Sequence, residues 1–461
     1  MKKRFQLSGN MKNVAKISSG TVLGQLISIL TLPLITRIYG ASILGVWTTI
    51  YAIANLINMV SDLGMTQSVM ICKEENAPKT LGVLLLLTGS ISLLAAPVVG
   101  IYCYFVIGYG WGQTLTVILF AVLYGLSLQL SQVCYTWLNR NKQYSALMKN
   151  PVLNYLSMAV ITLTLGYLGF EKYGYFIGMT VAQMLTLLHM LRFMPRKLPR
   201  ISRTAVGEVI RENKEFVKYQ LPSNMAYQFR EQLPNLLIGG LFGDAILGCY
   251  SVSLKLLNIP VTFIGQALGK VFYQRLAELK QKGQQVSDFI YRNISRAMKL
   301  AIIPMILLAA FGDAAVVMFF GEVYAMGGVI VRIVAFRAVF TFISTSTQGM
   351  DIVLGKQRYA MLCCLAQTGA MALAIAGSFY LTHNIYWCAV IMTVFFIVIQ
   401  VTYFCAIFKT VEIRPLRYLK SIGVSLAVVL VAAFALRAAY IWIMELTGWG
   451  LLEYLGQFLV R

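Results

Sequence analysis

The residues best suited to binding chemistry are four cations that lie inside long apolar segments of the chain. Arg230 is followed directly by Glu231, Lys255 lies in the middle of the next apolar segment, and Arg332 and Arg337 are five residues apart in a later one, broadly on one side of a helix. Ionisable groups in such segments are costly unless they are paired or face water, so each is a functional candidate. Four cations against one carboxylate suit an anion, and the planar fork of arginine suits phosphate. We expect a cationic cavity that binds a diphosphate headgroup.

A structural explanation of the same charges stays open, because these residues could form a salt-bridge network that only holds helices together. Glu231 is expected chiefly as the partner of Arg230, with proton coupling as its alternative. Asp62, near the end of an earlier apolar segment, is a second candidate for coupling or salt-bridge pairing. Gln25 and Gln228, which are 203 positions apart, complete the substrate-binding candidates.

Patterns typical of catalysis or metal binding are not found in the sequence. There is no Ser-His-Asp constellation, no glycine loop followed by Lys-Ser or Lys-Thr, and no cluster with metal-ligand spacing. The two histidines, His189 and His383, are far apart, and most of the eight cysteines lie in apolar segments, where they read as packing residues. We therefore expect a non-enzyme without a bound cofactor or metal, and coupling to H+ or Na+ stays open.

The elements that must position these residues are membrane-spanning helices. Of the 461 residues, 58% are hydrophobic and 12% charged, and the mean hydropathy is +0.72. A bilayer core needs about 20 apolar residues per helix, and runs of that length recur throughout. The expected fold is an all-α polytopic membrane protein with 12–14 transmembrane helices. The spans are expected at 14–38, 42–66, 80–107, 111–137, 147–169, 174–194, 217–241, 245–272, 299–320, 325–350, 359–381, 385–408 and 420–443, and the tail from Glu445 could add another.

Charge in the gaps between spans predicts the orientation. The formal net charge is +22, and the Lys and Arg residues gather in every second gap, while the other gaps are short turns in which only Lys172 is basic. Basic loops stay in the cytoplasm, so we expect a cytoplasmic N-terminus, with the first helix kept as an anchor rather than removed. The turns on the outside are too short for an extracytoplasmic domain, and the charge is explained by topology rather than by nucleic acid.

A longer basic segment after the sixth span divides the chain. We expect an N-terminal lobe over 1–194, a cytoplasmic linker over 195–216 with an amphipathic helix from Ser202, a C-terminal lobe over 217–409, and extra helices over 410–461. The stretch GASILGVW beginning at Gly40 matches GDAILGCY beginning at Gly243. Both copies occupy the turn between the first two helices of a half, which predicts two six-helix lobes related by a pseudo-twofold axis along the membrane normal.

The opening hairpin resembles a known family. GTVLGQ at 20–25, LPLITRIYG at 32–40, LGVW at 44–47 and SDLG at 61–64 are similar to the first hairpin of the polysaccharide exporters (Wzx-type flippases) of the multidrug/oligosaccharidyl-lipid/polysaccharide superfamily. The resemblance implies a two-lobed bundle that works by alternating access. It also implies a cargo of undecaprenyl-diphosphate-linked oligosaccharide, such as the repeat of O-antigen (lipopolysaccharide), capsule or exopolysaccharide, moved across the bacterial cytoplasmic (inner) membrane.

Other functions within and outside this superfamily remain as alternatives. A peptidoglycan-precursor flippase would meet the same headgroup chemistry, whereas a cation-coupled multidrug exporter would favour buried carboxylates over cations. A membrane glycan polymerase or ligase would need a sizeable outer loop. The expected partners are the lipid-linked glycan and membrane lipids, with a polysaccharide polymerase and chain-length machinery as further candidates, and no nucleic acid.

Overall fold

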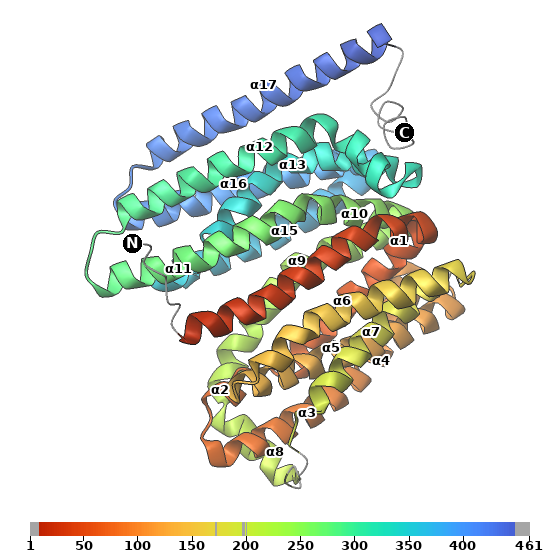
Figure 1. Cartoon of the computed structure of the whole chain (residues 1–461), viewed down its shortest axis with the longest axis vertical. Helices are drawn as coiled ribbons and strands as arrows, with labels where there is room; N and C mark the ends of the chain where they lie inside the picture. Colours follow the sequence, from red (N-terminus) through yellow and green to blue (C-terminus); the bar gives the residue numbers. More distant parts are fainter. Residues whose placement is uncertain (1–8, 171–172, 196–198, 200, 448–461) are drawn as a thin grey trace, which may run out of the picture. The chain divides into compact units, whose positions relative to one another are not determined.

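The computed structural model describes residues 9–170, 173–195, 199 and 201–447, and within them every regular element is a helix (Figure 1). The chain divides into two compact units, Met1–Gly240 and Leu241–Arg461. The first unit therefore contains the helix that ends at Phe242 almost entirely, whereas the lobes predicted from sequence place that helix in the second half. The predicted domain limits remain a prediction.

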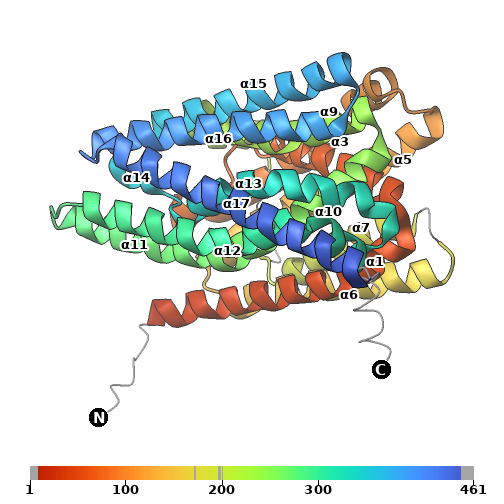
Figure 2. The same cartoon turned by 90° about the horizontal axis from the view of Figure 1, so that it is seen from above.

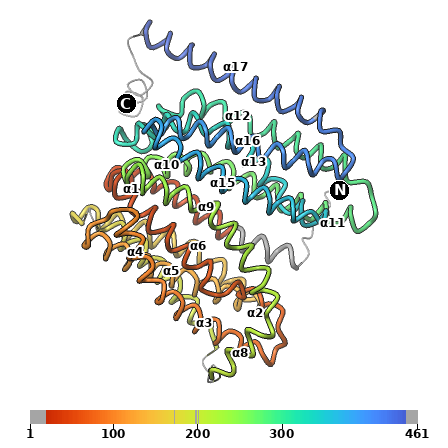
Figure 3. The backbone as a smooth tube through the Cα atoms, turned by 180° about the vertical axis from the view of Figure 1, so that it is seen from behind, coloured from red at the N-terminus to blue at the C-terminus, as the bar shows by residue number. Residues whose placement is uncertain are grey.

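The helices of the first unit follow the apolar segments closely. Their bounds are α1 (Gly9–Ser61), α2 (Ser68–Ile71), η1 (Glu74–Asn76), α3 (Ala77–Leu94), α4 (Ala96–Ile101), η2 (Tyr102–Ile107), α5 (Trp111–Arg140), α6 (Tyr144–Tyr167), α7 (Gly174–Leu191), α8 (Arg203–Glu212), η3 (Phe216–Gln220) and α9 (Leu221–Phe242). α1 is two helices joined at Gly40, whose φ of 68° is favourable for glycine alone. In Figure 3 the helices α5 and α6 lie beside α1, against which both pack.

Small residues let α1 approach α6 closely. A Cβ added at Gly20 would lie 2.0 Å from the backbone oxygen of Met148, and one added at Gly24 would lie 2.6 Å from the Tyr155 ring. These two glycines form a Gly-x-x-x-Gly pair, the arrangement that brings membrane helices into backbone contact. Close packing of this kind explains the glycines in the first hairpin motif.

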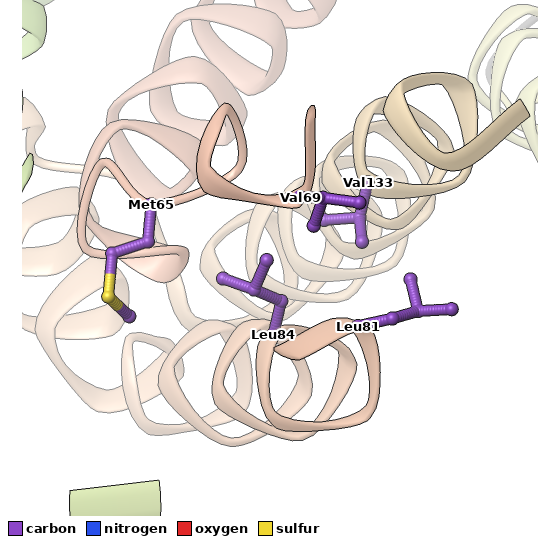
Figure 4. Close-up of a cluster of buried hydrophobic side chains, with 5 residues drawn as sticks. All are labelled: Met65, Val69, Leu81, Leu84 and Val133. Carbon is purple, nitrogen blue, oxygen red and sulfur yellow. The ribbon is translucent and has the colours of Figure 1, made fainter. Parts of the chain in front are cut away.

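A buried cluster fixes α3 and α5 to the turn after α1. Met65, Val69, Leu81, Leu84 and Val133 are all fully buried (Figure 4). Such contacts supply dispersion energy even where the surrounding solvent is lipid. The cluster holds the short segment α2 beside the spans.

The second unit continues the same pattern. Its helices are α10 (Asp244–Pro260), η4 (Val261–Gly265), α11 (Gln266–Gln281), α12 (Ser287–Phe320), η5 (Glu322–Tyr324), α13 (Ala325–Ser346), α14 (Met350–Leu354), α15 (Gln357–Thr382), α16 (Ile385–Thr410) and α17 (Pro415–Thr447). Figure 2 shows α15 and α16 running side by side, and α17 packs against α12 and α16.

Ten helical segments of the described residues are long and apolar enough to span a membrane. The first of them, Ser19–Ser61, contains the first two predicted spans on either side of Gly40. α6 and α9 are not among the ten, yet they coincide with the predicted fifth and seventh spans. The chain is therefore a multi-pass helical membrane protein. Most of the predicted extra tail, 448–461, lies outside the described residues.

The predicted amphipathic helix is α8. The helix begins after Ser202, which is its N-cap. The Oγ of Ser202 accepts a 3.1 Å hydrogen bond from the backbone N–H of Ala205, as is usual for an N-cap serine. Ala205 and Val209 are buried, while Glu208 forms an ion pair with Lys79 of α3. The helix is thereby attached to the first unit by one apolar face and one ion pair.

Candidate functional site

A polar stripe runs from the end of η3 along α9 and carries one of the predicted sites. Gln220, Asn224, Tyr227 and Glu231 follow one another at intervals of four, three and four residues, which places them on one face of a helix. The side-chain amide of Gln220 donates a 2.8 Å hydrogen bond to Asn224. A polar face of this length on a helix that ends in apolar residues marks a surface that does not face lipid.

Arg230 is oriented by neighbours on its own helix. Its Nε and Nη2 atoms lie 3.0 and 2.8 Å from Glu231 Oε1, and its guanidinium lies over the Tyr227 ring, 5.0 Å from the centroid. The Arg230 and Glu231 side chains remain 27% and 45% exposed. The two residues thus form an accessible ion pair rather than a buried one, and its carboxylate is the partner expected from the sequence.

The two glutamines predicted beside this site lie in the same unit. Gln25 on α1 and Gln228 on α9 are both half-buried. Their predicted role in binding substrate stays a prediction.

Lys255 is exposed in the middle of a long span. Its neighbours Ser253 and Leu257 are buried, so α10 packs on one side and presents Lys255 on the other. No carboxylate in the described part of the chain lies within ion-pair distance of its ammonium group. A π-helical segment, Val261–Gly265, follows soon after, and such segments often occur beside functional residues.

Arg332 belongs to an ion cluster that links three helices. Its Nη1 atom lies 3.7 Å from Asp313 Oδ2 of α12, and its Nε donates to the Ala309 carbonyl oxygen at 3.2 Å. Arg437 of α17 contacts the same carboxylate, with Nη2 2.7 Å from Oδ2 and Nη1 3.0 Å from Oδ1. Arg437 was not among the residues predicted from the sequence, although a cation inside the predicted span 420–443 is a signal for it.

Arg337 faces a different neighbour from Arg332. Its guanidinium lies over the Phe396 ring of α16, 4.5 Å from the centroid, whereas Arg332 turns toward α12 and α17. Five residues advance a helix by about 500°, which leaves the two side chains about 140° apart. The two arginines therefore have different partners in this unit, and their predicted role in binding substrate stays a prediction.

Asp62 closes the turn that follows α1. Its Oδ1 accepts a hydrogen bond from the Gly64 backbone N–H at 2.9 Å, and its Oδ2 accepts one from Thr66 at 3.1 Å. Leu63 and Gly64 both have positive φ angles, 51° and 72°. Asp62 is buried, with 5% of its surface exposed, and its carboxylate stabilises this turn. Its predicted role in coupling or salt-bridge pairing stays a prediction.

Candidate metal ligands do not gather in the described residues. No group of three or more His, Cys, Asp and Glu side chains there could hold a metal ion. The described spans offer cations, amides, the Arg230–Glu231 ion pair and the Asp313 ion cluster.

A family model described as polysaccharide biosynthesis protein matches residues 34–326. The chain belongs to this family. The matched region includes Asp62, Arg230 and Lys255, so these residues lie within the part of the chain that the family shares. No match is found among curated proteins.

Solved structures show the fold class at low sequence identity. The lipid II flippase MurJ in an inward closed conformation is 9% identical, with a TM-score of 0.69, covering 94% of this chain and 99% of that one. An inward-facing MATE-family multidrug resistance transporter of the MOP superfamily is 12% identical, with a TM-score of 0.63 over 87% and 98%. A MOP-superfamily transporter from Pyrococcus furiosus is 14% identical, with a TM-score of 0.55 over 87% and 96%. The fold is that of MOP-superfamily transporters, as the opening hairpin motifs predict.

Proposed function

We propose that this protein is a flippase that moves undecaprenyl-diphosphate-linked oligosaccharide units across the bacterial cytoplasmic (inner) membrane by alternating access. The observation that carries the proposal is Lys255, an exposed residue within a span, with no carboxylate within ion-pair distance of it among the described residues. A charge at this depth is stabilised by water or by a counter-ion. The diphosphate of a lipid-linked glycan supplies such a counter-ion.

The family and the arginine on α9 support the same cargo. Membership in the polysaccharide biosynthesis family favours a glycan over a drug. Arg230 keeps its guanidinium accessible while Glu231 orients it, and an oriented arginine suits phosphate oxygens. We infer that Lys255 and Arg230 contact the diphosphate, with Gln25 and Gln228 as further polar contacts and Glu231 as the residue that positions Arg230.

Orientation and partners form part of the proposal. The distribution of basic residues supports a cytoplasmic N-terminus. The glycan-linked lipid is the principal partner, and a polysaccharide polymerase with its chain-length machinery would receive the product.

The test is transbilayer movement of an undecaprenyl-diphosphate-linked oligosaccharide in proteoliposomes. Lys255→Gln and Arg230→Gln should each lower the rate by about tenfold or more, because each removes a charged contact to phosphate. Arg292→Gln is the matched control, since Arg292 is an exposed cation that pairs with Asp288 at the start of α12. Wild-type rates in both span variants would refute the assigned cation sites.

The choice of cargo separates the alternatives within the superfamily. Wild-type protein that moves a peptidoglycan precursor but no other lipid-linked glycan would be a precursor flippase. Transport of a cationic fluorescent drug, driven by an H+ or Na+ gradient, would identify a multidrug exporter instead.

A further inference from the structure

The second unit contains a groove that the proposed transport does not use. It lies between α12, α13, α16 and α17 and has a volume of about 650 Å³, which is within the usual range for small-molecule sites. α13, α16 and α17 each contribute a row of residues three or four positions apart, so one face of each helix forms the wall. The row on α17 runs from Leu426 to Arg437, which corresponds to about 16 Å.

The groove is apolar along its length and charged at one end. Its polar lining residues are Arg332, Arg437 and Thr393, and the other lining residues are aliphatic, alanine or phenylalanine. Arg332 is in the second turn of α13, and its partner Asp313 is two turns before the end of α12. The charged end therefore lies near the helix termini, and the apolar rows extend from there toward the middle of the spans.

The charges at this end do not cancel. One carboxylate, that of Asp313, contacts two guanidinium groups, Arg437 at 2.7 Å and Arg332 at 3.7 Å, which leaves one net positive charge. The two arginine side chains are 23% and 33% exposed. Because an uncompensated cation in the hydrocarbon region is costly, a singly charged anion would complete this cluster.

The open side of the groove is apolar as well. On α17, Leu430 and Phe434 line the groove and are 56% and 78% exposed. Only 17% of the α17 span is buried inside the protein. Surface of this kind contacts lipid, so the occupant arrives from the membrane rather than from water.

We propose that this groove binds one anionic glycerophospholipid, with its phosphate at Arg332 and Arg437 and one acyl chain along the apolar rows. The single negative charge of such a headgroup matches the single excess positive charge of the cluster. The diphosphate of the proposed cargo carries more charge than the cluster can neutralise. The inference therefore stands independently of the proposed function.

Competition between two lipids tests the proposal. The purified full-length protein is mixed with phosphatidylglycerol and phosphatidylcholine of identical acyl chains, and bound lipids are counted by native mass spectrometry. Wild-type protein should prefer phosphatidylglycerol by about tenfold, the effect of one charge-assisted contact. Equal binding of the two lipids would overturn the proposal.

Two variants separate charge from packing. Arg437→Gln leaves a neutral Arg332–Asp313 pair and should abolish the preference. The double variant Asp313→Asn/Arg437→Gln breaks the same contacts but restores one net positive charge, and it should prefer phosphatidylglycerol again. Equal behaviour of the single and double variants would mean that the cluster acts only in holding α17, and the proposal would fail.

A third variant fills the groove without changing its charge. Ala433 is buried in the lining, so Ala433→Phe should reduce the number of tightly bound phosphatidylglycerol molecules by one, and this result does not depend on the ion pairs being intact. Unchanged lipid counts in Ala433→Phe would contradict the assignment. Displacement of phosphatidylglycerol from wild-type protein by equimolar undecaprenyl diphosphate would assign the groove to the cargo instead.

Discussion

Gln183 on α7 and Gln400 on α16 make the same two amide hydrogen bonds, each within its own unit. The side-chain Nε2 of Gln183 donates to Ser131 Oγ at 3.1 Å, and its Oε1 accepts from the amide of Asn154 at 3.0 Å. The Nε2 of Gln400 likewise donates to a serine Oγ at 2.7 Å, and its Oε1 accepts from an amide at 2.9 Å. The partners of Gln400 are Ser344 and Gln367.

The helices that carry these residues also correspond. Ser131, Asn154 and Gln183 lie on α5, α6 and α7, the fourth, fifth and sixth spans, and the partners of the second network lie on α13, α15 and α16, the tenth, eleventh and twelfth. A network with the same donors, acceptors and helix order in both units supports the internal repeat proposed from the Gly40 and Gly243 motifs.

Replacing Gln400 with leucine should destabilise the second unit. The change leaves Gln367 and the Ser344 hydroxyl without their shared partner, and an unsatisfied buried polar group costs about 1–3 kcal/mol. Gln183→Leu should have the same effect in the first unit. Thermal unfolding of the purified protein in detergent measures both.

The control for these variants is Gln281→Leu, at the exposed end of α11, which should leave the melting temperature unchanged. Melting temperatures of Gln400→Leu and Gln183→Leu equal to that of wild type would show that neither network contributes to stability.

A bulky residue at Gly20 should prevent α1 from packing on α6. Valine there would place its Cβ 2.0 Å from the Met148 carbonyl oxygen, so the helices would have to separate. Gly89→Val is matched to it, since Gly89 on α3 has no neighbouring atom within 4 Å of an added Cβ. Yield of folded, monodisperse protein should fall for Gly20→Val alone, and similar yields for the two variants would contradict the close approach.

Much of the fold could be predicted because a bilayer requires each span to satisfy its own backbone hydrogen bonds. Long apolar runs therefore indicate helices directly. Even α6 and α9, which are less apolar, lie where spans were predicted. The amphipathic helix α8 was predicted from Ser202 onward, and the structure shows that Ser202 is its N-cap. These features depend on neighbouring residues in the chain.

The site was less predictable because it depends on contacts between distant residues. Arg437 pairs with Asp313, which is 124 positions away in the chain, and no local sequence pattern predicts that pairing. The two glutamine networks were missed for a related reason. Ser131 and Ser344 differ by 213 positions, but Gln183 and Gln400 differ by 217, so a comparison at one fixed offset cannot align both.

The role of Asp62 can be separated from ion coupling by two substitutions. Asp62→Ala removes both acceptors of the turn and should reduce stability by about 1–3 kcal/mol, whereas Asp62→Asn keeps one acceptor oxygen and should recover part of that loss. Chemical unfolding of both variants measures the difference, and transport should follow stability. Transport abolished in Asp62→Asn at wild-type stability would indicate a coupling carboxylate.

Attachment of α8 should weaken in acid. The hydrogen bond and charge of Lys79 lower the pKa of the Glu208 carboxyl below its usual value. Because the pKa of Glu208 is lower in the folded state, the ion pair stabilises the folded protein at pH values above the unfolded-state pKa, near 4.3. This contribution is lost as the pH falls through the folded-state pKa. Because Glu208 is exposed, the effect is small and should decrease further at high salt.

Hydrogen exchange of Arg203–Glu212 in wild type and Glu208→Gln measures this effect. The variant should exchange faster than wild type at neutral pH and low salt, and the two rates should converge below the Glu208 pKa. A constant ratio of the two rates across pH would show that the ion pair does not hold the helix.

The single-residue joints at Gly40 and Gly243 limit how the two helices that each of them connects can move. Gly40, with ψ of 169°, and Gly243, with φ of 92° and ψ of 165°, each separate two helices without any further linker. Because a single residue joins the two helices, neither helix can shift along its axis relative to the other by more than about 1.5 Å, the rise of one residue. Rearrangement at these joints is therefore a change of angle about the glycine rather than a shift along the helix axis.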